Sequence, residues 1–136
     1  MSTIAVSLSI CHMSAPQPPR GSRIRGPGKT GTEEVEHEPV HATIAAQPTK
    51  HMLVTHGTDS MVQTGHVLAS VPDKTIVMTG ALSPARFRGS DAEFNIGCAI
   101  GAVQALPTGV YIAMNGRIWD PAKVRKNVAA NRFEAV

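Results

Sequence analysis

The sequence is poor in the residues that mark several specialised protein classes. It holds only two cysteines, Cys11 and Cys98, far apart in 136 residues, which excludes a disulfide-rich scaffold and indicates a reducing cytoplasm. No apolar run approaches the roughly 18 residues that a membrane helix needs, and the short run 4–10 lacks the preceding basic residues of a secretory signal. We therefore expect neither membrane association nor secretion. Aromatic residues make up 4% of the chain, so aliphatic and small side chains must fill the core, which favours closely packed sheet and helix layers.

The charge balance does not by itself indicate a partner. The net charge is +3 and the isoelectric point is near 9.2, but the basic residues are scattered and are not grouped with aromatic ones. Nucleic-acid sites usually need such a group. A polyanion partner therefore has no support in the sequence, and we expect no nucleic acid.

The composition changes near residue 42. Residues 14–40 are rich in Pro, Gly and charged residues and show no apolar period, which predicts a poorly ordered arm. From residue 42 onward, short apolar runs alternate with helical patterns. The sequence therefore predicts an atypical segment over 1–41 and one α/β domain over 42–136, a size that allows a single core.

Three nearly continuous apolar runs predict parallel strands that are buried on both faces. They are 52–54, 74–78 and 110–114, and residues 42–46 are expected to end a preceding helix. A first crossover helix is expected to open at Thr58-Asp59, both common N-cap residues. A second should start near Ser90-Asp91 and pack on the sheet through the mostly small face Phe94, Cys98, Gly101 and Ala105.

This order predicts a three-layer, doubly wound, mostly parallel sheet with right-handed connections. Ligands of such sheets bind outside the carboxyl ends of the strands. The segments that follow those ends are 55–59 (THGTD), 79–81 (TGA) and 115–117 (NGR). They carry hydroxyls, a carboxylate, an amide and glycines, so we place the site at this edge.

Five blocks follow one another along the chain: LVTHGTDSM (53–61), KTIVMTGAL (74–82), SDAEFNIG (90–97), GVYIAMNG (109–116) and VRKN (124–127). In this order they resemble the bacterial-type L-asparaginases, in particular a short single-domain form, over about residues 51–132. The resemblance implies an asparaginase N-terminal-type fold, a homo-oligomer without metal or cofactor, and hydrolysis of L-asparagine or a similar carboxamide to the acid and ammonia.

The resemblance also implies the site residues. The family's Thr-Lys-Asp group falls on Thr58, Lys126 and Asp59, with Thr58 as nucleophile, Lys126 as its base and Asp59 as the anchor of the substrate amino group. A threonine hydroxyl needs a neighbouring base near pH 7, and a partly buried lysine can supply one. Backbone N–H groups near Gly57 and Ala81 are expected to bind the substrate and stabilise the oxyanion.

The family's Thr-Gly-Gly-Thr-Ile block, which ends its first strand, has no counterpart here. Either the sheet lacks its first strand and exposes an apolar edge, or residues 4–10 fill the gap. A catalytically impaired remnant, which binds an amino acid or pairs with another subunit, is therefore the alternative to the enzyme.

Several of these residues have ordinary structural interpretations. Thr58 and Asp59 could only cap a helix, Lys126 could belong to a solvated basic run, and Asp91 and Asn95 are as easily helix-capping as site-bracing. Cys98 is interpreted as a core residue.

Two motifs suggest other chemistry. His37-Glu38-Pro39-Val40-His41 fits the H-E-x-x-H zinc pattern, but Pro39 argues against a helix, so we expect a solvated segment. Residues 26–30 (GPGKT) resemble a phosphate loop but lack its first glycine and a preceding strand.

Overall fold

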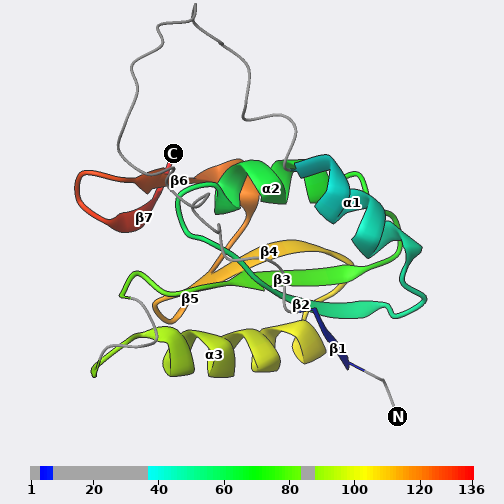
Figure 1. The fold of residues 1–136 in the computed structure, drawn as a ribbon, viewed down its shortest axis with the longest axis horizontal. Coiled ribbons are helices and arrows are strands. Elements are labelled where there is room, and N and C mark those ends of the chain that lie inside the picture. The colour runs from blue at the N-terminus through cyan, green and yellow to red at the C-terminus, as the bar shows by residue number, and fades with distance from the viewer. Residues whose placement is uncertain (1–3, 8–36, 84–87) are drawn as a thin grey trace, which may run out of the picture.

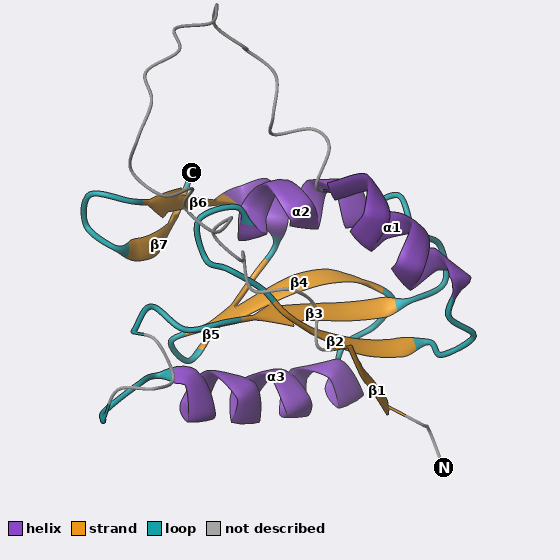
Figure 2. Ribbon diagram, viewed as in Figure 1, coloured by secondary structure: helices purple, strands orange, loops and turns teal. Residues whose placement is uncertain are grey.

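The protein has three layers, with a central sheet between helices (Figures 1 and 2). The computed structural model describes residues 4–7, 37–83 and 88–136. The helices α1 (His37–Ala46) and α2 (Met61–Leu68) cover one face of the sheet, and α3 (Ala92–Ala105) covers the other. The prediction of a three-layer α/β domain with a mostly parallel sheet is confirmed.

The central sheet has the order β1-β2-β3-β4-β5. Four of its strands are parallel, β1 (Ile4–Ser7), β2 (His51–Thr55), β3 (Thr75–Thr79) and β4 (Gly109–Met114). The three predicted apolar runs are β2, β3 and β4. β1 pairs with β2 along its length, so a segment within 4–10 occupies the position where the sequence left open a gap.

The chain after β4 forms elements that the sequence did not predict. β5 (Arg117–Trp119) turns back antiparallel to β4, a 3-10 turn η1 (Pro121–Lys123) follows, and β6 (Val124–Asn127) pairs antiparallel with β7 (Arg132–Ala135) in a separate small sheet. These strands are three or four residues long, too short to give a clear apolar period.

Alternate residues of the strands supply two cores. Met52, Val54, Ile76, Met78, Ile112 and Met114 pack with Ile44 of α1 and with Met61 and Leu68 of α2. Leu53, Val77 and Ala113 face the other way and pack with Ala99 and Val103 of α3. This period of two, buried on both sides, explains why the strands are apolar throughout.

The connections on either side of β3 have opposite hands. β2, β3 and β4 are neighbours in chain order and all parallel, yet α2 and α3 lie on opposite faces (Figure 1). Two such crossovers in the same direction cannot share a hand, so one is left-handed. The expectation that both would be right-handed is therefore wrong. The chain therefore leaves the carboxyl ends of β2 and β3 toward opposite faces of the sheet.

Helix α1 begins earlier than the sequence predicted. It starts at His37, before the expected boundary at residue 42, and includes Pro39. Proline is tolerated in the first turn because the backbone N–H groups there have no partner within the helix. The expectation that Pro39 argues against a helix over 37–41 was therefore wrong, while residues 14–36 lie outside the described part of the chain.

Helix α2 begins later than predicted and α3 is rotated. Residues 58–60 form a turn, Ser60 is the N-cap of α2, and no side chain caps it. The buried residues of α3 are Asn95, Ala99 and Val103, whereas Phe94 of the expected face is 61% exposed. Cys98 is only half-buried, so it is not the core residue that the sequence suggested. An almost uniformly apolar helix has no polar face to set its rotation.

This rotation predicts that Gly101→Ala raises the free energy of unfolding by about 0.5–1 kcal/mol, because alanine costs less backbone entropy than glycine in a helix. A Cβ at Gly101 would meet nothing within 4 Å. Denaturant unfolding followed by circular dichroism measures the change. Ala99→Leu, on the buried face, is the matched control and should destabilise by about 1–3 kcal/mol. A destabilised Gly101→Ala would contradict the observed rotation.

Candidate active site

Two turns meet at the carboxyl ends of β2 and β3. The His56 backbone N–H donates to the Thr79 carbonyl at 2.8 Å. A Cβ placed on Gly80 would lie 2.3 Å from the His56 carbonyl oxygen and 3.5 Å from Thr58 Cγ2. Only glycine allows this approach of backbone to backbone, which brings the segments THGTD and TGA together at the predicted edge.

Lys126 reaches this edge from the small sheet. Lys126, which the resemblance assigned to the site, lies on β6. Alternation along β6 turns Val124 and Lys126 inward and Arg125 outward. The Lys126 Nζ then donates to Thr58 Oγ1 at 3.2 Å and lies 3.9 Å from Asp59 Oδ1.

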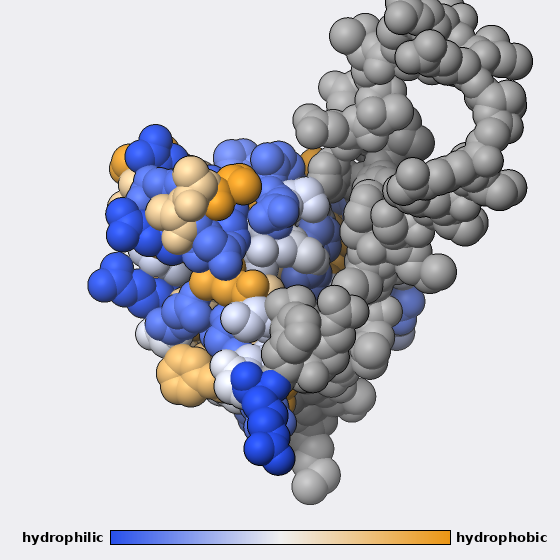
Figure 3. All heavy atoms as spheres, turned by 60° about the vertical axis from the view of Figure 1, so that its left-hand side comes forward, coloured by the Kyte–Doolittle hydropathy of each residue, from blue (hydrophilic) through white to orange (hydrophobic). Residues whose placement is uncertain are grey.

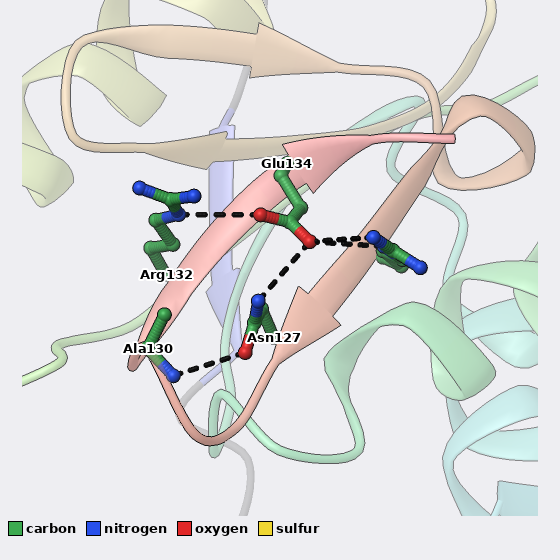
Figure 4. A network of polar contacts seen from close by, with 5 residues as sticks. Asn127, Ala130, Arg132 and Glu134 are labelled. Carbon is green, nitrogen blue, oxygen red and sulfur yellow. Dashed lines mark hydrogen bonds and ion pairs between the residues drawn. The ribbon is translucent and has the colours of Figure 1, made fainter.

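The hairpin that carries Lys126 is held by polar contacts on its outer face (Figure 4). The Glu134 carboxylate accepts hydrogen bonds from Asn127 Nδ2 at 3.2 Å, Arg132 Nε at 3.2 Å and Arg125 Nε at 3.0 Å. The Asn127 Oδ1 accepts from the Ala130 N–H at 2.9 Å and closes the turn. Hydrophilic residues, with some hydrophobic ones among them, cover the described part of the face seen in Figure 3.

The Lys126 side chain is only 4% exposed, although that of Asp59 is 78% exposed. Its Nζ also donates to Asn131 Oδ1 at 2.8 Å and lies 5.3 Å from the centre of the Phe133 ring, its cross-strand neighbour. Burial lowers the pKa of Lys126 below its ordinary value, and the charges of Asp59 and Asp91 partly oppose this. Burial of the ammonium thus favours the neutral amine, the form that can accept a proton.

A buried amide organises the ends of β3 and β4. Asn95, fully buried on α3, donates through Nδ2 to the Gly80 carbonyl at 2.9 Å and to Asp91 Oδ2 at 2.8 Å, and its Oδ1 accepts from the Asn115 N–H at 2.8 Å. Asp91 accepts from the N–H groups of Leu82 and Ser83 at 3.1 and 3.0 Å. The sequence left capping and bracing open for this pair, and their contacts brace the turn. The sequence signal was their place at the start of the second predicted helix, within the block SDAEFNIG.

The Asp91 carboxylate stays charged in this setting. Burial raises its pKa, but the hydrogen bonds from Ser83, Leu82 and Asn95 outweigh burial, and the net pKa is lowered. Its side chain does not cap α3. Its charge therefore acts on the nearby Lys126.

Gly57 and Ala81 lie in the two turns that follow β2 and β3. Gly57 is exposed, and its carbonyl lies 2.7 Å from His56 Nδ1. Ala81 is half-buried and follows Gly80, whose carbonyl is held by Asn95. Within the described residues, the N–H groups of Thr58 and Ala81 donate no hydrogen bond.

The alternative zinc motif does not assemble a ligand set in the described part of the chain. His41 Nε2 lies 2.9 Å from Ser70 Oγ, and no group of three His, Cys, Asp or Glu side chains there could hold a metal ion. The phosphate-loop segment lies outside the described residues. A hollow of about 410 Å³ between α2, β4 and η1, lined by His66, Tyr111 and Asp120 among others, does not include Thr58, Asp59 or Lys126.

A family model described as "Asparaginase, N-terminal" matches residues 36–136. The chain belongs to the asparaginase family. L-asparaginase 2 of Escherichia coli (strain K12) is 32% identical over 83 residues, covering 57% of this chain and 24% of that protein. A crystal structure of a probable cytoplasmic L-asparaginase from Campylobacter jejuni superposes with a TM-score of 0.59 at 28% identity, covering 69% of this chain and 31% of that one.

The chain thus spans about a quarter to a third of these relatives. The resemblance that the five sequence blocks carried is confirmed at the level of family and fold. Among the described residues, no helix is long and apolar enough to cross a membrane.

Proposed function

We propose that this asparaginase-family chain is an amidohydrolase that converts L-asparagine or a similar carboxamide and water to the corresponding acid and ammonia. One observation carries the proposal. A nearly buried lysine, Lys126, lies 3.2 Å from a threonine hydroxyl, Thr58, at the sheet edge where the sequence placed the site. A hydroxyl beside a base with a lowered pKa is a usual arrangement for an activated nucleophile.

Lys126 and Thr58 exchange a proton in this proposal. The protonated ammonium donates to Thr58 Oγ1, and after loss of a proton the bond reverses, so the hydroxyl donates to the amine. The Thr58 oxygen attacks the carboxamide carbon as its proton passes to Lys126, and the C–N bond breaks as that proton passes to the leaving ammonia. Water then hydrolyses the Thr58 ester and releases the acid; where Thr58 instead activates a water, that water attacks directly and the acid forms in one stage. The amides near Gly57 and Ala81 stabilise the negative charge that develops on the carbonyl oxygen.

Asp59 anchors the substrate. Its carboxylate is 78% exposed and lies beside Lys126, so it can meet an amino group that arrives from solvent while the reacting end enters toward Thr58. L-Asparagine is a short carboxamide that carries such an amino group at the end opposite its reacting carboxamide group. We also propose a homo-oligomer, as the family resemblance implies, and a cytoplasmic location, in line with the name of the Campylobacter relative.

Ammonia release from L-asparagine tests the function directly. L-Glutamine and a carboxamide without an amino group, such as propionamide, define the substrate class. We expect turnover of L-asparagine, and a raised KM with lowered kcat for Asp59→Ala. If the protein binds L-aspartate but releases no ammonia, the remnant that the missing Thr-Gly-Gly-Thr block suggests replaces the enzyme.

The pH profile of kcat supplies a further prediction. Lys126 must be neutral to accept a proton, so kcat rises as the pH rises through its pKa. Burial lowers that pKa and the Asp91 charge raises it. Asp91→Asn removes the charge and keeps an acceptor oxygen, so the rising limb should move to lower pH.

Asp120→Asn is the matched control. Asp120 lies beside Lys123 on the surface, with Oδ2 3.6 Å from its Nζ, and is not among the charges that act on Lys126. The rising limb of the pH profile of kcat for Asp120→Asn should coincide with that of the wild type. A shift of the Asp91→Asn limb to higher pH would contradict the role of Lys126 as base.

A further inference from the structure

Two hydrogen-bond contacts of the His56 ring nitrogens bear on which of them carries a proton. Nδ1 lies 2.7 Å from the Gly57 carbonyl oxygen, and Nε2 lies 3.0 Å from Thr64 Oγ1. A carbonyl oxygen can only accept, so Nδ1 carries the proton. In the neutral ring Nε2 is then an acceptor, and the hydroxyl of the fully buried Thr64 can donate to it.

This contact fixes a peptide plane. The Gly57 carbonyl belongs to the Gly57–Thr58 peptide group, which is planar and trans, as the described chain has no cis peptide bond. Its N–H, on Thr58, points away from the carbonyl. A side chain that holds the Gly57 oxygen therefore also sets the direction of the Thr58 N–H.

Three observations make that N–H the group of interest. Within the described residues the Thr58 N–H donates no hydrogen bond. It belongs to the same residue as the proposed nucleophile, and a nucleophile's own N–H is a common oxyanion donor. The neighbouring turn repeats the arrangement, since Asn95 Nδ2 holds the Gly80 carbonyl at 2.9 Å and so orients the Ala81 N–H.

We infer that His56 is a positioning residue, which in its Nδ1-protonated form clamps the Gly57 carbonyl and aims the Thr58 N–H at the carbonyl oxygen of the substrate carboxamide. The role in turnover rests on the proposed function. The clamp itself does not, because the tautomer and the orientation of the Thr58 amide can be measured without a reaction. Preset donors of this kind strengthen transition-state binding because they need no reorganisation during the reaction.

Two substitutions of His56 test the hydrogen bonds of its two ring nitrogens separately. In His56→Asn the Nδ2 group takes the place of Nδ1 and can still donate to the Gly57 carbonyl. In His56→Gln the amide is one bond longer and reaches the place of Nε2, so the contact with Thr64 is kept and the clamp is lost. If His56 had a purely structural role, the two substitutions would alter activity only as far as they alter stability, which thermal unfolding measures.

The steady-state constants for L-asparagine give the first readout. His56→Gln should lower kcat about tenfold or more with KM nearly unchanged, since a misdirected donor weakens the transition state more than the ground state. His56→Asn should keep kcat within about threefold of wild type. Equal loss in both variants, or loss that follows their melting temperatures, would overturn the inference.

The second readout is long-range ¹H–¹⁵N NMR of the imidazole and the Thr58 amide in the full chain. We expect a protonated Nδ1 and an unprotonated Nε2 in the wild type, and a Thr58 amide signal that moves in His56→Gln but not in His56→Asn. If the wild type releases no ammonia, the proposed function fails, while these signals still support the clamp. A proton on Nε2 alone would overturn the clamp even in an active enzyme.

Discussion

Thr58→Ala and Lys126→Met are each expected to lower kcat for L-asparagine hydrolysis by a factor of about 10² or more. The two groups lie 3.2 Å apart, and removal of either member of a nucleophile and base pair disables the unit. The double variant should lose little more than either single one, because both changes abolish the same step. Steady-state ammonia release measures all three.

The matched control for the lysine is Lys123→Met. Lys123 precedes β6, and its side chain is 81% exposed, so its loss should leave kcat within about twofold of wild type. Full activity of Thr58→Ala would remove Thr58 from the mechanism. Equal losses in Lys126→Met and Lys123→Met would show an effect of net charge and not of the base.

Gly80→Ala is expected to destabilise the fold by about 3 kcal/mol or more. The added Cβ would lie 2.3 Å from the His56 carbonyl oxygen and 3.1 Å from Met61 Cε. The methionine can move, but the carbonyl belongs to the backbone that links β2 to Thr58, so the two turns must separate. Urea unfolding, followed by circular dichroism, measures the loss of free energy.

Gly57→Ala serves as the control for stability alone. Its Cβ would meet nothing within 4 Å, and we expect a change within about 0.5 kcal/mol. If Gly80→Ala and the wild type unfold at the same urea concentration, the close approach of the two turns is not part of the folded state.

The strands of the main sheet could be predicted because a strand that is buried on both faces must be apolar along its whole length. The runs around Val54, Val77 and Ile112 needed no further information. α3 could be predicted as a helix but not oriented. Phe94 and Val103 are both large and apolar, and only the shape of the sheet decides which of them is buried.

The hand of the connections was also beyond local sequence. The right-handed rule describes most crossovers, and no residue in the two connections on either side of β3 marks one of them as an exception. The effect of Pro39 was also predicted wrongly, because a proline is disruptive inside a helix but acceptable in its first turn. Which turn it occupies depends on where the helix starts.

The sequence by itself determined the family, the buried strands and the two turns that end β2 and β3, because these depend on residue type and order along short segments. Only the tertiary structure decided that Lys126 faces inward from a separate hairpin, and that His56 and Asn95 hold the carbonyls of the two turns. Lys126 is distant from Thr58 in sequence, and its contact depends on the path of β5, η1 and β6 around the sheet edge. A side chain's hydrogen-bond partner is set by that path and by burial, neither of which a local pattern records.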